Sequence, residues 1–210
     1  MTDPTSLTPP PETEPLPVTE QPLEERIPRG LMSTEAARFL HDQASKVPAG
    51  LAVVEIGVYT ASTLLWMAHG AGPDGARCFG VDPWDLAHNP NHSPRRAHFT
   101  DPAVHTQAVE NVAASGLDVT LIRGFSVDIA RSWDGPMIGL LHIDGSHNEQ
   151  AVKSDFAAWR KHLTSGATVV FDDYNRRKMG VKRAVDRLVR RGYIVDLRVV
   201  ADRLAVTRAP

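Results

Sequence analysis

Two kinds of apolar pattern alternate along most of the chain. Short, nearly continuous apolar runs are typical of strands buried on both faces, and they are LAVVEIG (51–57), RCFGVD (77–82), DVTLIRG (118–124), IGLLHID (138–144) and ATVVFDD (167–173). Between them, apolar residues at helical spacing predict helices near 34–47, 61–70, 102–115, 127–133, 148–164 and 179–191. YIVDLRVV (193–200) and RLAVTR (203–208) indicate a closing hairpin.

Strands that alternate with helices and end in a hairpin are typical of one fold class. We expect an α/β fold, a Rossmann-like, doubly wound and mostly parallel seven-stranded sheet with a C-terminal antiparallel hairpin. In such sheets, ligands bind outside the carboxyl ends of the strands, near the point where strand order reverses. The length of 210 residues suits one such domain.

The N-terminal segment differs in composition from the rest. Residues 1–25 hold six acids and no base, and eight of the sixteen prolines fall within residues 1–28. So little apolar surface cannot offset the entropy lost on ordering. We therefore expect a disordered Pro/Glu-rich tail over 1–29, either a solvated extension or a docking arm, and one folded domain over 30–210.

Composition bears on the cellular compartment of the protein. The single cysteine, Cys78, cannot form an internal disulfide. No run of about eighteen apolar residues predicts a membrane span, and the acidic N-terminus lacks the basic and apolar regions of a secretory signal. We expect a cytoplasmic protein without a membrane partner.

Carboxylates follow several of the predicted strands. Because the carboxyl ends of parallel strands share one edge, we expect these acids to lie on one rim: Glu55, Asp82, Asp144, Asp172 and Asp173. Three of them, Asp144, Asp172 and Asp173, would repel one another without compensation. Mg²⁺ or another hard divalent cation accepts such oxygen ligands, whereas the absence of a nearby cysteine disfavours zinc. The alternative is that these acids only cap helices or turns.

A histidine follows the first of these acids in the stretch HIDGSH (142–147). An imidazole titrates close to neutral pH, so His147 suits the role of general base beside Asp144. The alternative is a solvent-facing residue at a helix N-terminus.

The turn after the first predicted strand, in VVEIGVYTAST (53–63), is a candidate ligand site. Tyr59 and Ala61 stand where a dinucleotide fingerprint has further glycines, so a tight pyrophosphate cradle is not expected. A ligand with an amino-acid carboxylate and ammonium suits this looser turn better. The predicted cofactor contacts here are Glu55, Gly57, Tyr59 and Ser62.

Two further stretches could complete a nucleoside site. Asp82, 25 residues after Gly57, has the spacing of an acid that holds ribose hydroxyls. Trp84 either covers an adenine face or packs in the core. Gly124 and Ser126 either line an adenine pocket or, at Ser126, cap a helix.

Two basic or histidine-bearing segments are ambiguous. The loop over 83–102 contains His88, His92 and His98 and is long enough for a lid or substrate loop, or it is a surface loop without a role. Residues 176–191 hold eight bases and one acid around an apolar stripe. The basic face predicts nucleic-acid binding, a solvated surface or a contact with a partner subunit.

These motifs together resemble a known family. From about residue 31 onward the chain resembles class I S-adenosylmethionine-dependent O-methyltransferases of the small metal-dependent type. It is most similar to actinobacterial enzymes that methylate sugar hydroxyls on macrolides, aminocoumarins or methylmannose polysaccharides. The most specific part is HIDGSH, followed 28 residues after Asp144 by the pair Asp172–Asp173. Catechol O-methyltransferase has similar acids but a lysine in place of His147, which favours the sugar branch.

The resemblance implies a function and a set of roles. It implies that Asp144, Asp172 and Asp173 hold Mg²⁺ and that His147 is the base, with Asp144 also catalytic and beside the cofactor. It implies that Glu55 and Gly57 line the S-adenosylmethionine site, with Asp82 on the ribose and Ser126 near the adenine. We expect an acceptor that is a small molecule or oligosaccharide, contacted by Tyr174, Asn175 and Arg176, and a homodimer.

Other classes are weighed against this reading. A methyltransferase acting on nucleic acid or on a phenolic or catechol molecule shares the fold. A nicotinamide oxidoreductase is disfavoured by the missing glycines. A non-catalytic binding module would not need an intact set of acids with His147.

Overall fold

The computed structural model describes residues 22–84, 102–176 and 180–210. Its strands are β1 (Ala52–Ile56), β2 (Arg77–Asp82), β3 (Val119–Arg123), β4 (Ile138–Ile143), β5 (Leu163–Phe171), β6 (Val195–Val200) and β7 (Leu204–Arg208). Its helices are α1 (Leu23–Arg26), α2 (Thr34–Ala44), α3 (Ser62–Ala71), α4 (Pro102–Ser115), α5 (Ser126–Arg131), α6 (Glu149–Trp159) and α7 (Val181–Arg190), with a 3₁₀ turn, η2 (Arg160–His162), after α6.

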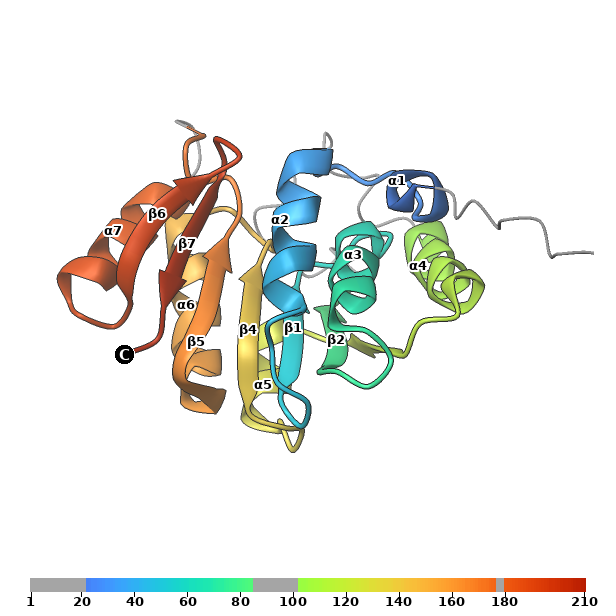
Figure 1. The fold of residues 1–210 in the computed structure, drawn as a ribbon. Helices are drawn as coiled ribbons and strands as arrows, with labels where there is room; N and C mark the ends of the chain where they lie inside the picture. Colours follow the sequence, from blue (N-terminus) through green and yellow to red (C-terminus); the bar gives the residue numbers. More distant parts are fainter. Residues whose placement is uncertain (1–21, 85–101, 177–179) are drawn as a thin grey trace, which may run out of the picture.

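One seven-stranded sheet organises these elements in the order β3-β2-β1-β4-β5-β7-β6 (Figure 1). The five strands from β3 to β5 pair in parallel, whereas β7 is antiparallel to both β5 and β6. The predicted doubly wound sheet with a closing hairpin is confirmed. Strand order reverses between β1 and β4, which is where such sheets bind ligands.

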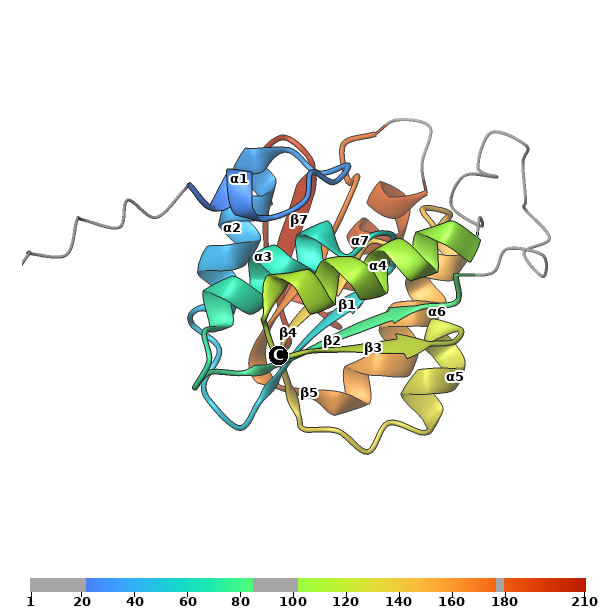
Figure 2. The same cartoon turned by 90° about the vertical axis from the view of Figure 1, so that its right-hand side faces the viewer.

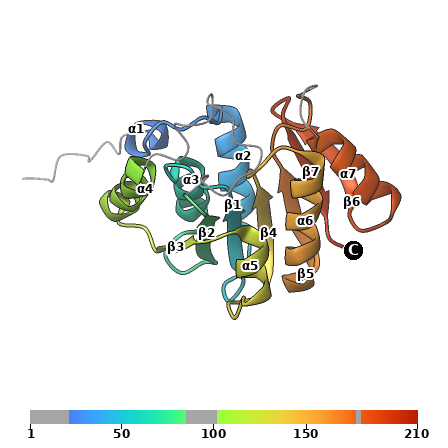
Figure 3. The same ribbon diagram turned by 180° about the vertical axis from the view of Figure 1, so that it is seen from behind.

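Helices cover both faces of the sheet. α2, α3 and α4 lie over one face (Figures 1 and 2), and α5, α6 and α7 lie over the other, seen from behind in Figure 3. Side chains of β1 alternate between the two layers: Val53 packs with the α2–α4 side, and Val54 with the α5–α7 side. All five residues of β1 are buried, as its continuous apolar pattern predicts.

Some predicted boundaries were wrong. The helix predicted over 148–164 ends at Trp159, because Leu163 already pairs with Ile138 at the start of β5. The last part of the predicted tail is folded: Leu23–Arg26 form a helix and Ile27 is buried against Ala37 and Leu65. Residues 1–21 lie outside the described residues.

The hairpin between β6 and β7 has a tight turn that reaches the carboxyl edge of the sheet. Ala201 and Asp202 both adopt left-handed backbone angles, with φ of 50° and 53°, and Arg203 N donates to Val200 O at 3.2 Å. Two left-handed central residues are the mark of a type I′ turn, whose twist matches that of the strands. Tyr174 N in turn donates to Arg203 O at 2.9 Å, so the turn lies against the segment that follows β5.

Across the described ranges, no helix combines the length and apolarity that crossing a bilayer requires.

Candidate active site

Backbone pairing carries the strand register past the ends of β4 and β5. Asp144 N donates to Ile56 O at 2.8 Å, and Asp172 N donates to Ile143 O at 3.1 Å. These two bonds place both acids at the same edge of adjacent strands. The strand alternation also turns Asp172 to the sheet face that Val170 shares, toward α2 and α3.

The predicted acids and histidine meet at this edge. Asp144, His147 and Asp172 each offer a ligand atom within 4.8 Å of the others. His147 Nε2 lies 3.1 Å from Asp144 Oδ1, and His147 Nδ1 lies 3.4 Å from Asp173 Oδ2. We call Asp144, Asp172 and Asp173 the acid cluster. The imidazole of His147 lies between Asp144 and Asp173.

Sequence reasoning missed a fourth charged residue, Arg203. Its Nε donates to Asp172 Oδ1 at 2.6 Å and its Nη2 donates to Asp172 Oδ2, so the contact is bidentate. Nη2 also lies 3.0 Å from Asp173 Oδ1. Arg203 is 31 residues further along the chain than Asp172, and only the pairing of β7 with β5 brings the two together.

The charges at this edge perturb one another. Burial raises the pKa of Asp144 to about 7, although its hydrogen bond to His147 opposes the rise. Burial also acts to raise the pKa of Asp172, but the hydrogen bond and charge of Arg203 outweigh it and hold that pKa below its usual value. For His147, burial lowers the pKa, yet the hydrogen bond to Asp144 and the surrounding carboxylates bring the net value above normal.

A second buried polar pair lies one step further into the sheet. Glu55 pairs with His142 across β1 and β4, and His142 Nδ1 lies 3.0 Å from Glu55 Oε1, with both side chains at most 1% exposed. Burial raises the pKa of Glu55. Glu55 Oε2 and His142 Nε2 have no hydrogen-bond partner among the described residues. Such orphaned buried atoms call for a partner, and a bound polar ligand or water supplies one.

The structure gives a reason for glycine at position 57 that the sequence did not indicate. Its φ is +87°, and a Cβ there would lie 2.4 Å from the carbonyl oxygen of Asp144. The glycine therefore permits close approach of the Asp144–Gly145 turn, rather than only of a ligand. Tyr59 and Ala61 also take left-handed angles, with φ of 54° and 68°. Glycine adopts such angles without the steric cost that other residues meet.

Asp82 fastens this turn to the end of β2. Its carboxylate accepts from Val58 N at 2.8 Å, Tyr59 N at 3.1 Å and Trp84 N at 2.8 Å. Burial nevertheless raises its pKa. Whatever ligand contact it makes, Asp82 already holds the backbone of the turn.

Trp84 is a packing residue in the structure. Its side chain is buried, its Nε1 donates to Tyr59 O at 2.8 Å, and its ring lies 4.7 Å from that of His105 on α4. These contacts favour the alternative of core packing over the prediction that Trp84 covers an adenine. Sequence could not decide this, because the backbone at Trp84 is left-handed, with φ of 44°.

Ser126 and Gly124 line the start of α5. Ser126 is not a helix cap, because Phe125 holds that position; its Oγ accepts instead from Trp159 Nε1 at 2.9 Å. Ser126 also hydrogen-bonds the buried carboxyl of Asp155 on α6, which sequence reasoning did not single out. Gly124 leaves room for Ile129, whose Cδ1 would lie 2.8 Å from an added Cβ.

Asp155→Asn is expected to remove a pH dependence of stability. Burial raises the pKa of Asp155 from 3.8 to about 6, so folding takes up a proton between these values. Stability from this group is therefore lost as pH rises through that window. The amide does not titrate, and the unfolding free energy of the variant relative to wild type should increase by on the order of 3 kcal/mol from about pH 4 to pH 7. Urea unfolding at both pH values measures it; a constant difference would contradict the assignment.

The predicted acceptor residues lie beside the acid cluster but differ in orientation. Tyr174 is buried, donating from its hydroxyl to Asp186 Oδ1 at 2.7 Å on α7, which does not favour a contact with an acceptor. Asn175 Nδ2 is bound to Asp202 Oδ1 at 3.1 Å. The Nε of Arg176 lies 3.1 Å from Asp173 Oδ1, and its side chain is 60% exposed. Arg176 is the best placed of the three to reach a ligand.

The basic face of α7 is partly neutralised within the chain. Arg183 and Arg187 both pair with Glu149 at the start of α6, at 3.0 and 3.1 Å. Lys182 pairs with Asp186 at 3.1 Å. These pairs account for much of the basic pattern without nucleic acid. The histidines of the predicted lid or substrate loop, His88, His92 and His98, lie outside the described residues.

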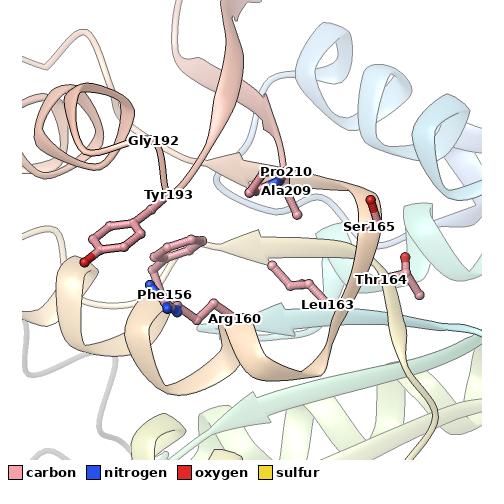
Figure 4. A pocket seen from close by; sticks show the side chains of 9 residues that line it. All are labelled: Phe156, Arg160, Leu163, Thr164, Ser165, Gly192, Tyr193, Ala209 and Pro210. Atoms are coloured by element: carbon pink, nitrogen blue, oxygen red, sulfur yellow. The ribbon is translucent and has the colours of Figure 1, made fainter.

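A cavity of about 270 Å³ lies at the other end of the sheet (Figure 4). It is lined by Leu163 and Thr164 at the start of β5, by Phe156 and Arg160, and by Tyr193. Since the acid cluster follows the end of β5, this cavity is separate from the candidate active site.

Known proteins share this architecture. A family model described as a methyltransferase domain matches residues 54–174, which span both Glu55 and the acid cluster. A cofactor-bound structure of Rv0187 from MTB is 20% identical, with a TM-score of 0.66 and coverage of 89% of this chain and 85% of that one. The O-methyltransferase TomG from Streptomyces achromogenes, involved in tomaymycin synthesis and in complex with SAM, is 19% identical, with a TM-score of 0.64 and coverages of 89% and 85%.

A third solved structure agrees with these two. An O-methyltransferase from Bacillus cereus in complex with SAH is 15% identical, with a TM-score of 0.60 and coverages of 90% and 86%. At these identities the likeness establishes the fold, and the chemistry has to be argued from the residues of this chain.

Proposed function

The chain belongs to the methyltransferase domain family, and we propose that it transfers the methyl group of S-adenosylmethionine to a hydroxyl of a sugar, in a glycosylated small molecule or an oligosaccharide, with a divalent cation. The observation that carries this proposal is the acid cluster around His147 at the carboxyl edge of the sheet. A general base beside carboxylates that can hold a cation suits the activation of a hydroxyl, whose oxygen the cation can bind. An amine acceptor does not need a cation in this role.

The residues of the acid cluster fit a hard divalent cation. All of the candidate ligands are carboxylates apart from one imidazole, a set that suits Mg²⁺ or Mn²⁺. Arg203 and Arg176 lie 3.0 and 3.1 Å from Asp173 Oδ1 and offset part of the negative charge of the cluster. Burial still raises the pKa of Asp144 to about 7, and a bound cation would stabilise its charged form. Asp144, Asp172 and Asp173 would hold the cation.

The proposed cofactor site lies beside this cluster, where strand order reverses. Glu55 Oε2 offers a buried acceptor for the ammonium of the methionine part. No described side chain caps α3, whose first N–H groups suit a carboxylate. Asp82 and Ser126 would face the ribose and the adenine. The complexes of the Bacillus cereus enzyme with SAH and of TomG with SAM support the choice of cofactor.

The chemistry then follows from the positions of the side chains. When bound, the cation would polarise the acceptor hydroxyl, and S-adenosylmethionine would supply the methyl group and leave as S-adenosylhomocysteine. His147 would accept the hydroxyl proton at a ring nitrogen as the oxygen–carbon bond forms. The hydrogen bond between Nε2 and Asp144 Oδ1 at 3.1 Å fixes the orientation of the ring, so Nδ1, whose contact with Asp173 Oδ2 is longer at 3.4 Å, is the nitrogen that would take the proton. Holding the reactants in line contributes much of the rate, on the order of 7–11 kcal/mol in well-oriented systems.

The sugar acceptor is argued from the base. A histidine stands where the similar catechol enzymes have a lysine, and nothing in the acid cluster requires two adjacent acceptor oxygens. A phenolic acceptor is the second candidate, and the internal ion pairs of α7 make nucleic acid the weakest.

Removal of the metal is the direct test of this proposal. We expect release of S-adenosylhomocysteine, measured over a panel of glycosylated and phenolic acceptors, to require Mg²⁺ or Mn²⁺ and to stop in EDTA. Turnover should return when the cation is added in excess. Undiminished turnover in EDTA with any acceptor would contradict the metal assignment, and turnover only with phenols would replace the sugar by the second candidate.

A further inference from the structure

Arg203 occupies the acid cluster in a way that bears on the proposed cation. Its guanidinium makes a bidentate contact with Asp172, whose side chain is fully buried, and its own side chain is 19% exposed. The same Nη2 lies 3.0 Å from Asp173 Oδ1. One fixed positive charge thus serves two of the three proposed ligands.

The position of Arg203 is fixed by the fold rather than by a flexible side chain alone. Arg203 O accepts from Tyr174 N at 2.9 Å, next to the acid pair. Asn175 Nδ2 donates to Asp202 Oδ1 at 3.1 Å, so the hairpin turn is joined to the same segment a second time. These bonds hold the guanidinium in register with Asp172 and Asp173.

We propose, resting on the proposed function, that Arg203 sets the affinity of the metal site. It competes with the divalent cation for Asp172 and Asp173 and so weakens cation binding. Each Asp172 oxygen already gives one lone pair to the guanidinium. A cation that joins the cluster must share these oxygens and lie within a few ångströms of a positive charge. The site is therefore built for a loosely held, exchangeable cation, and for Arg203 to keep the acids together without one.

A nearby arginine provides a graded comparison. Arg176 Nε lies 3.1 Å from Asp173 Oδ1, but its side chain is 60% exposed and it does not contact Asp172. Water screens such an exposed pair, so its charge should affect the cluster much less.

The test is a titration of the purified full chain with Mn²⁺, followed by electron paramagnetic resonance of the free ion. We expect Arg203→Met to bind Mn²⁺ more tightly than wild type, by roughly 5- to 150-fold, the usual size of a coupling between two bound groups. Arg203→Lys keeps the charge but loses the bidentate contact, and should tighten binding by less. Arg176→Met should tighten binding by less than Arg203→Met, because its pair with Asp173 is exposed. Arg131→Met is the control: it removes an exposed arginine that pairs with Asp128 on α5, and it should leave the affinity at that of wild type.

Stability offers a second measurement, because Arg203→Met leaves the buried Asp172 unpaired. Mn²⁺ should raise the melting temperature of this variant more than that of wild type. If Arg203→Met does not fold, the comparison of wild type with Arg203→Lys decides.

Two results would overturn the inference, and only one of them would also refute the proposed metal site. Unchanged or weaker Mn²⁺ affinity in the Arg203 variants would refute the competition while leaving the proposed metal site standing. No Mn²⁺ binding by any of the proteins, with S-adenosylhomocysteine still bound, would refute the metal site and the competition together.

Discussion

Asp144→Ala and Asp173→Ala are each expected to lower the methyl-transfer rate by about 10³-fold or more, while S-adenosylhomocysteine still binds. Both residues are proposed ligands of the cation and both contact His147. A Lewis-acid contribution of several kcal/mol corresponds to about three powers of ten in rate. The measurement pairs initial rates with calorimetric titration of S-adenosylhomocysteine.

Asp128→Ala is the control for these variants. Asp128 is an exposed acid on α5 whose ion pair with Arg131 lies on the surface, so its loss should leave the rate nearly unchanged. Full activity of both cluster variants in the presence of a chelator would refute the role of the acid cluster.

His147→Gln is expected to reduce the rate by about 10²- to 10⁴-fold, the usual contribution of a general base. The neutral imidazole is the form that accepts a proton, so wild-type activity should rise with pH as His147 is deprotonated. Glutamine cannot titrate, and the pH-dependent rise should disappear.

Binding measurements separate this role from a structural one. His147→Gln should bind S-adenosylhomocysteine like wild type, since Glu55, Gly57 and the start of α3 are unchanged. A variant that keeps the wild-type rate and pH profile would show that another group takes the proton.

The sequence carried the information for the fold and for the local part of the site. Continuous apolar runs and helical spacing are enough to place strands and helices alternately, because each buried strand needs a helix on both faces. Asp144 and His147 follow one strand and Asp172 and Asp173 follow another, so the parallel topology alone brings them to one edge.

Residues that depend on register or side-chain direction escaped prediction. Arg203 reaches Asp172 only because β7 pairs antiparallel with β5, and His142 meets Glu55 only through the pairing of β4 with β1. Trp84 has a left-handed backbone, and its indole Nε1 donates to Tyr59 O, a contact that its position in the sequence did not indicate. Periodicity carries no signal for such long-range pairings or for a single unusual φ.

The most direct test of the central claim is an isothermal titration of the full chain with S-adenosylhomocysteine. We expect saturable binding of one molecule per chain at micromolar concentration, since the proposed contacts at the β1–α3 turn all come from one chain. No heat at any usable concentration would contradict the account. The acid cluster would then serve a different reaction, and metal-dependent hydrolysis would be the first to test.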